Sequence, residues 1–259
     1  MKRYRAILTG ASGGIGQAIA AALAPQCEAL LLVGRDAARL EQARRAAGPV
    51  ARTLVADLAT PAGRAAVSLS EANLLINNAG AGDFAWLEAQ DDAMLERIVQ
   101  ANVLAPMQLT RRLLPELRRR PAAWIVNVGS IMGYLGYPGH AAYCASKFAL
   151  RGFSEALRRE LADTLVRVLY LAPRATRTAM NGARVDALNA ELGVAMDPPE
   201  TVARQLVQLL ERPARERLLG MPEALFARLN QLLPGLVDRA LRRQLPVIRR
   251  HALSKGGFK

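Results

Sequence analysis

A tyrosine and a lysine four residues apart, Tyr143 and Lys147, stand in the stretch YCASK and could form the centre of a proton-transfer site. On a helix, residues at this spacing lie on one face, one turn from each other. A free phenol titrates at about pH 10 and is a poor acid or base at neutral pH, but a neighbouring ammonium favours the phenolate and lowers its pKa. The same spacing is common by chance, with the ring packed and the lysine extended to solvent. The pair therefore predicts acid–base chemistry only if the rest of the chain builds a site around it.

The composition is that of a globular protein with a large buried core. The chain has 259 residues, of which 51% are apolar and 22% charged, so extensive disorder is excluded. The 35 basic and 22 acidic residues leave a net charge of +13. Such a charge could serve binding to nucleic acid, to an anionic membrane surface or to an acidic partner, or it could serve solubility alone. Neither a helix-turn-helix pattern nor zinc spacing accompanies the charge, so no nucleic-acid partner is expected.

Cysteine usage and hydropathy indicate a cytoplasmic protein. Cys27 and Cys144 are too few for a disulfide framework and lack the spacing of a metal site, so no metal is expected. No apolar run is long enough to span a bilayer, and the first one, at residues 6–9, is too short for a signal peptide. We therefore expect a cytoplasmic protein that is at most bound to a membrane surface.

A short apolar run at residues 4–9 leads directly into a glycine-rich stretch, TGASGGIG, and then into a helical pattern. Strand, glycine turn and helix in this order bind a pyrophosphate, because the glycines let the backbone approach and the helix N-terminus offers free N–H groups. The spacing of Gly10, Gly14 and Gly16 differs from G-x-G-x-x-G and is weak as a bare pattern. Its position directly after the first strand indicates a dinucleotide site.

The end of the second predicted strand, residues 28–33, should decide which dinucleotide binds. A carboxylate there accepts from the ribose 2′-OH of NAD, whereas an arginine can pair with the 2′-phosphate of NADP. Here Gly34 leaves the carboxylate position empty and Arg35 follows it, with the Ser12 hydroxyl as a further contact. Asp36 competes with this interpretation but is better placed as the N-cap of the next helix. The sequence therefore predicts NADP(H).

Strands and helices continue to alternate, which predicts an α/β fold with a doubly wound parallel sheet of the Rossmann type in a single domain. Further strands are expected at 50–56, 74–76, 124–128 and 166–171, and helices at 36–47, 91–119, 140–162 and 200–210. Polar or small residues follow several of these strands, at the edge where open parallel sheets bind ligands. Residues 174–197 lack a clear period and are expected to form a mobile loop with short helices beside the pocket.

Taken together and in order, these motifs resemble the short-chain dehydrogenase/reductase family over about residues 4–220. The glycine stretch resembles the family's cofactor motif, and Asn77-Asn78-Ala79-Gly80 resembles its fourth-strand motif. The resemblance implies a catalytic tetrad of Asn102, Ser130, Tyr143 and Lys147. It also implies cofactor contacts, with Asp57 at the adenine, from Gly10, Ser12, Gly14, Ile15, Gly16, Arg35, Asp57, Leu58, Asn78, Ala79, Gly80, Tyr143, Lys147, Pro173 and Thr178.

Two features depart from the family's pattern. Pro-Gly usually follows the sixth strand, whereas here Pro173 is followed by Arg174, which would place a bulky cation near the nicotinamide end. Thr178 still stands where the family's threonine contacts the nicotinamide carboxamide. The chain also exceeds the minimal fold, so we interpret residues 1–220 as the NADP-binding catalytic domain and residues 221–259 as a C-terminal appendage.

The appendage is predicted to be helical, amphipathic and basic. Apolar residues recur at helical spacing, interrupted by Pro234: Leu225, Phe226, Leu229, Leu232, Leu233, Leu236 and Val237. Every charged side chain from residue 239 onward is basic: Arg239, Arg242, Arg243, Arg249, Arg250, Lys255 and Lys259. We interpret the apolar face as a cover for the domain or an oligomer interface, and the alternative is contact with a membrane surface or an acidic partner.

The resemblance implies an NADP(H)-dependent oxidoreductase that interconverts a carbonyl and a secondary alcohol, in a homodimer or homotetramer. Tyr143 would transfer the proton and Ser130 would orient the carbonyl oxygen. Lys147 would lower the pKa of Tyr143 and hold the nicotinamide ribose, and Asn102 would anchor a water that relays protons to Lys147.

Two alternatives remain open. One is a cofactor-binding interaction protein without turnover, and the other is a membrane-surface reductase of lipid-like or acyl-thioester ketones. A serine hydrolase is excluded because no G-x-S-x-G elbow surrounds Ser130. His140 is expected at the pocket rim or in a structural role.

Overall fold

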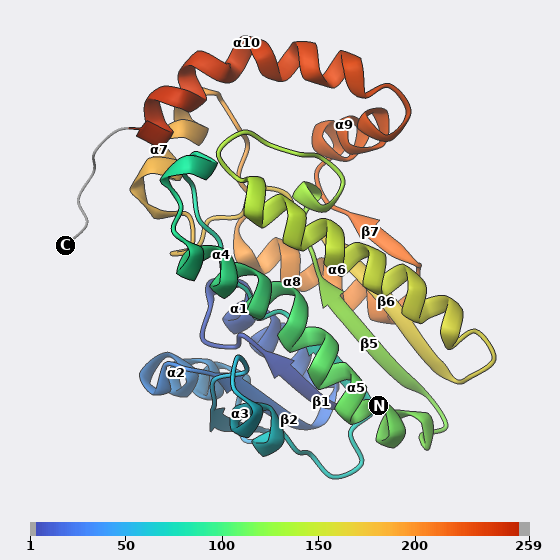
Figure 1. The fold of residues 1–259 in the computed structure, drawn as a ribbon. Coiled ribbons are helices and arrows are strands. Elements are labelled where there is room, and N and C mark those ends of the chain that lie inside the picture. Colours follow the sequence, from blue (N-terminus) through green and yellow to red (C-terminus); the bar gives the residue numbers. More distant parts are fainter. Residues whose placement is uncertain (1–3, 254–259) are drawn as a thin grey trace.

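Seven parallel strands form the central sheet of the structure, a computed structural model that describes residues 4–253 (Figure 1). Their order is β3-β2-β1-β4-β5-β6-β7, so the chain winds outward from β1 to β3, crosses back to β4 and winds outward again. The strands are β1 (Tyr4–Thr9), β2 (Cys27–Gly34), β3 (Ala51–Val55), β4 (Leu74–Asn77), β5 (Ala123–Val128), β6 (Val166–Ala172) and β7 (Glu216–Leu218). The predicted doubly wound sheet is confirmed, with its switch point between β1 and β4.

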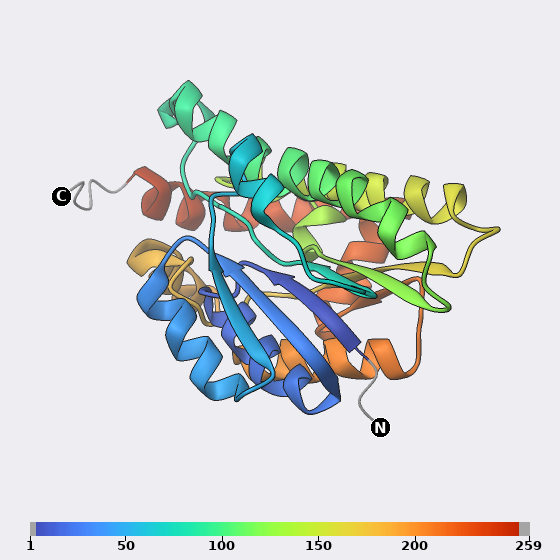
Figure 2. The same ribbon diagram turned by 90° about the horizontal axis from the view of Figure 1, so that it is seen from below.

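Helices cover both faces of this sheet (Figure 2). One layer consists of α1 (Gly14–Leu23), α2 (Ala37–Ala47) and α8 (Pro199–Glu211). The other consists of α3 (Pro61–Ala66), α4 (Asp92–Val99), α5 (Ala105–Arg118) and α6 (Ala141–Glu160). Because successive side chains of a strand point to opposite faces, Ala6 and Leu8 of β1 join the first layer's core, whereas Ile7 joins the second. Burial on both faces explains why the strands read as continuous apolar runs.

The edge strand β7 and one irregularity in a helix were not predicted from the sequence. β7 has three residues, none of them fully buried, and it pairs with the end of β6, so its sequence carries no strand pattern. The predicted helix over 91–119 is formed by α4 and α5, joined by a π-helical turn, η3 (Gln100–Leu104). The wider turn contains Asn102, and such turns occur often at functional sites.

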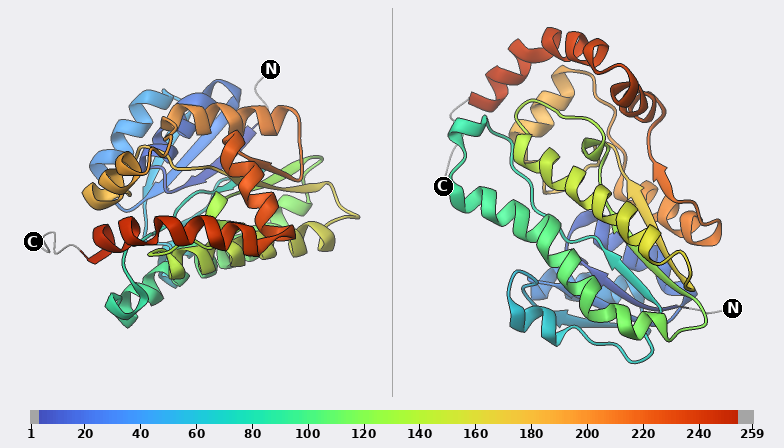
Figure 3. Two further views of the ribbon diagram at one scale, coloured as in Figure 1. Left: turned by 90° about the horizontal axis from the view of Figure 1, so that it is seen from above. Right: turned by 45° about the vertical axis from the view of Figure 1, so that its right-hand side comes forward.

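Three further helices, α7 (Gly182–Glu191), α9 (Met221–Leu232) and α10 (Pro234–Leu253), lie at the carboxyl end of the strands (Figures 1 and 3). α10 begins at Pro234, a residue that is favourable in the first turn of a helix. Ile248 and Ala252 of α10 pack against Phe84 and against Leu188 of α7, so α10 lies over the region that follows β4.

The predicted helices of the appendage are therefore present, while its treatment as a separate unit from residue 221 stays a prediction. Lys255 and Lys259 of the basic run lie outside the described residues. Within residues 4–253, no helix combines the length and hydrophobicity that a membrane span requires.

Candidate active site

The turn after β1 is shaped to let a ligand approach its backbone. Gly10 has φ of +65°, and a Cβ there would lie 2.7 Å from the Cα of Ala79. A Cβ on Gly16 would lie 2.1 Å from the carbonyl oxygen of Gly10, so only glycine lets helix α1 begin this close to the turn. These contacts give the glycine motif a structural reason, and they leave the N–H groups at the start of α1 facing a cleft.

This cleft, of about 1230 Å³, collects most of the predicted cofactor residues. Its lining includes Gly10, Ser12, Gly14, Ile15, Gly16, Arg35, Asp57, Leu58, Asn78, Ala79, Gly80 and Thr178. Pro173 lines a second, neighbouring cavity instead. The sequence motifs are thus brought together from β1, β2, β3 and β4, and the glycine backbone and cleft volume fit a dinucleotide.

The end of β2 places an arginine at the wall of the cleft. The predicted cap is formed, because the Asp36 carboxylate accepts a hydrogen bond of 3.0 Å from the backbone N–H of Arg39. Arg35 and Arg39 both line the cleft, and no carboxylate stands at Gly34. A Cβ at Gly34 would lie 2.7 Å from the Ser12 Oγ, so a side chain there would require the Ser12 hydroxyl to move.

The predicted tetrad lies where β5, α6 and η3 meet. Ser130 and Tyr143 line the second cavity, and a hydrogen bond joins their side chains. Lys147 is buried behind them, where its Nζ donates to the carbonyl oxygen of Val128 at 3.2 Å and lies 5.5 Å from the centre of the Tyr143 ring. The expected one-turn relation of the tyrosine and the lysine on α6 is therefore present.

Asn102 is buried beside them, and both the oxygen and the nitrogen of its side-chain amide form hydrogen bonds. Its Oδ1 accepts from the N–H of Ala81 at 2.8 Å, and its Nδ2 donates to the carbonyl oxygen of Ala81 at 2.8 Å and to Ser146 Oγ at 2.9 Å. The amide thus fastens η3 to the loop after β4 and to α6. The water relay that we expected Asn102 to support stays a prediction.

The protonation of the pair differs from the sequence expectation. Burial raises the pKa of Tyr143 to about 12, and its hydrogen bond with Ser130 opposes this shift without overcoming it. Burial also lowers the pKa of Lys147 to about 8. Lys147 therefore does not lower the pKa of the phenol in the protein alone, because the lysine loses its proton near pH 8 and is neutral where the phenol titrates. At neutral pH Tyr143 is a protonated phenol, which is the form that donates a proton.

The second cavity, of about 890 Å³, has a mainly apolar wall around this phenol. Its large apolar and aromatic side chains include Phe84, Leu135, Tyr137, Leu188, Phe226 and Leu241. His140 is at the rim and also structural, as expected, because its Nδ1 contacts the carbonyl oxygen of Asp83 at 3.0 Å and its ring faces Phe84. Ile15, Gly82, Thr178 and Met180 line both cavities, so a ligand in the cleft would meet one in the cavity.

Comparison with known proteins agrees with this arrangement. The short chain dehydrogenase family profile matches residues 4–189. The chain belongs to this family. It is also similar to dehydrogenase/reductase SDR family member 7B of Bos taurus, with 31% identity over 258 residues that cover 91% of this chain and 79% of the relative.

Solved short-chain dehydrogenases have the same fold. A 3-ketoacyl-(acyl-carrier-protein) reductase from Brucella melitensis, solved with NADH, matches with a TM-score of 0.72 and 28% identity, covering 79% of this chain and 89% of that one. A short chain dehydrogenase from Burkholderia cenocepacia, solved with NADP, matches with a TM-score of 0.81 and 24% identity, covering 93% of this chain and 98% of that one. Relatives of this fold thus occur with either nicotinamide dinucleotide.

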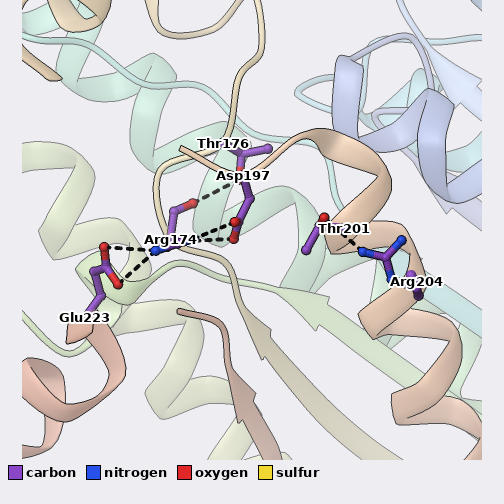
Figure 4. Close-up of polar contacts among 6 residues, drawn as sticks. All are labelled: Arg174, Thr176, Asp197, Thr201, Arg204 and Glu223. Atoms are coloured by element: carbon purple, nitrogen blue, oxygen red, sulfur yellow. Dashed lines mark hydrogen bonds and ion pairs between the residues drawn. The ribbon is translucent and has the colours of Figure 1, made fainter. Parts of the chain in front are cut away.

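Arg174, the departure from the short-chain dehydrogenase pattern, is held by two carboxylates (Figure 4). Its guanidinium donates to both oxygens of Asp197, at 2.7 and 3.0 Å, and reaches Glu223 of α9 at 3.4 Å. The Arg174 side chain is 19% exposed. Backbone bonds between Ala175 and Asp197 and between Arg177 and Asp197, each of 2.9 Å, close the same loop at its base. Arg174 therefore lines the second cavity with its charge neutralised by two carboxylates, and it joins the loop to α9.

Replacing Arg174 with methionine should destabilise the protein and loosen this loop. The change keeps most of the side-chain volume but leaves Asp197 and Glu223, which are 14% and 26% exposed, without their cation. Loss of one partner from a partly buried ion pair predicts a decrease of about 1–3 kcal/mol in the free energy of unfolding. Urea denaturation of the wild type and the variant measures this difference in the free energy of unfolding. The double variant Arg174→Met/Asp197→Asn should recover part of the loss, and equal stability of the wild type and the single variant would contradict the clamp.

Three residues that position the site were not predicted as site residues from the sequence. Thr9 Oγ1 accepts from the N–H groups of Asn78 and Ala79 at 3.0 and 3.1 Å, which joins the glycine turn to β4. Ser146 donates to the carbonyl oxygen of Tyr143 at 2.7 Å and accepts from Asn102. Tyr170 is buried behind Ser130, where a Cβ on Gly129 would lie 1.9 Å from its hydroxyl oxygen. Of these three contacts, only the one made by Tyr170 has a sequence signal. The signal is Gly129, directly before Ser130, because a glycine can mark the close approach of another group.

Proposed function

We propose that this short-chain dehydrogenase reduces a carbonyl group to a secondary alcohol with NADPH, and catalyses the reverse reaction with NADP⁺. One observation carries the proposal: Ser130 and Tyr143 line an apolar cavity that shares part of its wall with the nucleotide cleft. Proton donors beside a hydride source, within an apolar wall, are what carbonyl reduction requires. The residues of the cleft would hold the dinucleotide, which supplies the hydride when it is bound.

The protein's own groups would act on the carbonyl oxygen and its surroundings. Ser130 would donate a hydrogen bond to that oxygen and Tyr143 would donate the proton as negative charge develops on it. One N–H of Lys147 already donates to the carbonyl oxygen of Val128. The remaining N–H groups of Lys147 would donate to the ribose hydroxyls. Phe84, Leu135 and the other apolar side chains of the cavity would exclude water.

We expect NADPH to bind about ten- to a hundred-fold more tightly than NADH. Arg35 lines the cleft and can form a charge-assisted contact with the 2′-phosphate, worth about 1.5–3 kcal/mol. Arg35→Ala should weaken NADPH binding by that factor and leave NADH binding unchanged. Fluorescence titration of both dinucleotides at low ionic strength measures the two affinities.

The control is Arg52→Ala, which removes an exposed arginine of β3 that does not line the cleft. A reversed preference should need Ser12→Ala together with Gly34→Asp, because the single change would place a Cβ 2.7 Å from the Ser12 hydroxyl. Equal affinities of the wild-type protein for NADH and NADPH would show that Arg35 does not contact a phosphate.

The activity is tested by following NADPH oxidation with a panel of carbonyl compounds that ranges from small ketones to acyl thioesters, steroid-like ketones and long-chain ketones. The cavity predicts that bulky apolar ketones react and that small hydrophilic ones do not. NADPH binding without turnover across the panel would instead favour a cofactor-binding interaction protein.

Assembly into a homodimer or homotetramer is part of the same proposal. Val99, Leu104, Met107 and Phe148 are 36–43% exposed on α4, η3, α5 and α6. Apolar side chains on adjoining helices are typical of an interface between copies. Light scattering of the purified protein measures the assembly.

A further inference from the structure

The helices α9 and α10 carry an unusual share of exposed apolar surface. Within residues 4–253, fifteen large apolar side chains are exposed, and seven of them lie between residues 221 and 253. Five are gathered around the α9–α10 hairpin, each at least half exposed: Met221 79%, Leu225 64%, Leu232 79%, Leu233 53% and Leu236 50%. On α9, Met221, Leu225 and Leu232 recur at helical spacing and therefore share a face. We call these five side chains the hairpin leucine patch, Met221 included.

Arginines stand beside this patch. Arg228 is on the same face of α9, between Leu225 and Leu232, and the first half of α10 adds Arg239, Arg242 and Arg243, all of them exposed. Arg249 and Arg250 are also exposed but lie near the far end of α10, where Arg250 forms an ion pair with Glu191. Residues 221–253 contain these six arginines and two acidic residues, Glu223 and Asp238, a balance of +4 with histidine neutral. Glu223 is paired with Arg174, and Arg250 is paired with Glu191 of α7, so the surplus positive charge of this surface lies on the other arginines.

The inner side of the same helices belongs to the substrate cavity. The cavity is lined by Pro222, Phe226, Leu241 and Gln244. On the inner side of α10, Ile248 and Ala252 are buried. Figure 3 shows α10 lying across the carboxyl end of the sheet. The helices thus have a buried face toward the site and an apolar, basic face toward solvent.

We propose that this outer face of α9 and α10 docks onto an anionic lipid bilayer. Leucine side chains at the tip of a helical hairpin can enter the boundary between headgroups and acyl chains, and arginines beside them can contact lipid phosphates. Docking in this orientation places the helices that wall the apolar cavity at the lipid surface. Where the proposed reductase activity holds, its substrates are therefore apolar ketones that partition into the bilayer.

A second copy of the chain fits this face less well. In a two-fold symmetric contact the same patch meets itself, so the arginines around the leucines of one copy would face those of the other. An anionic bilayer can take up the leucines among its acyl chains and pair the arginines with its phosphates. Assembly of copies can use another set of exposed apolar side chains, Val99, Leu104, Met107 and Phe148.

The proposal is tested by co-sedimentation of the full chain with vesicles of phosphatidylcholine alone or with phosphatidylglycerol added. We expect binding only to the anionic vesicles, and loss of binding in about 1 M salt, where the Debye length is about 3 Å. Leu225→Ser/Leu232→Ser/Leu236→Ser should lower the bound fraction about tenfold or more, because three inserted side chains are lost. The matched control is Leu165→Ser, since Leu165 is 65% exposed in the turn before β6.

A second pair of variants tests the charge. Arg239→Gln/Arg243→Gln should weaken binding and reduce its dependence on salt, whereas Arg118→Gln/Arg119→Gln, at the end of α5, should change neither. The proposal is overturned if the wild type does not bind anionic vesicles at low salt, or if the triple serine variant binds as well as the wild type. It is also overturned if the triple variant only abolishes self-association in light scattering. NADPH oxidation with the carbonyl panel is measured in solution without vesicles, so failure of the proposed reductase function would be seen separately from failure of lipid binding.

Discussion

Tyr143→Phe should abolish turnover while NADPH binding persists. The change removes only the hydroxyl group, and with it the phenolic proton, while the ring keeps its contacts with Gly82 and His140. General acid catalysis contributes about 10²–10⁴-fold to a rate, so kcat with a ketone substrate should fall by at least that factor. Because burial holds the pKa of Tyr143 at about 12, the phenol is protonated at neutral pH and the reductive direction depends on it.

Tyr137→Phe is the matched control, because Tyr137 lines the same cavity and its hydroxyl has only a long contact of 3.5 Å with Gln244. The control variant should keep kcat within a few-fold, about the scatter expected for a change outside the chemistry. Near-normal turnover of Tyr143→Phe with a validated substrate would show that another group donates the proton.

Lys147→Met should reduce both turnover and NADPH affinity. Methionine fills a similar volume, but the Nζ that bonds to Val128 and lies beside the Tyr143 ring is removed. Loss of charged hydrogen bonds to the ribose predicts about ten- to a hundred-fold weaker NADPH binding, and kcat should fall by about 10²-fold or more. Leu150→Met, one turn further along α6 and also buried, is the control for packing. An unchanged NADPH affinity would remove the ribose contact from the proposed mechanism.

The protonation of Lys147 can be measured directly, because it is the only lysine within residues 4–253. In protein with carbon-13-labelled lysine, we expect one signal with a pKa of about 8, well below the ordinary value of 10.5, and absent from Lys147→Met. Since the folded-state pKa is the lower one, the charged lysine destabilises the fold below about pH 8, and this cost fades as pH rises toward 10.5. A signal that titrates near 10.5 would show that the side chain is solvated.

The sequence by itself determined the architecture and most of the site. Alternating apolar runs and helical patterns predicted the parallel sheet, because strands buried on both faces must be apolar throughout. The glycines after β1 and the positions of Asp57, Asn78, Ser130 and Tyr143 predicted the cleft and cavity that these residues line, since the carboxyl ends of parallel strands meet at one edge. The Asp36 cap could also be predicted, because capping depends on residues only three positions apart.

What only the tertiary structure decided concerns groups far apart in the chain. β7 has no pattern of its own and exists because β6 offers it an open edge. Arg174 is neutralised by Asp197 and Glu223, partners 23 and 49 residues away, which no local spacing indicates. The raised pKa of Tyr143 likewise results from burial by surrounding elements, whereas the sequence revealed only its neighbour Lys147. Long-range contacts and burial set these features, and both depend on how the whole chain packs.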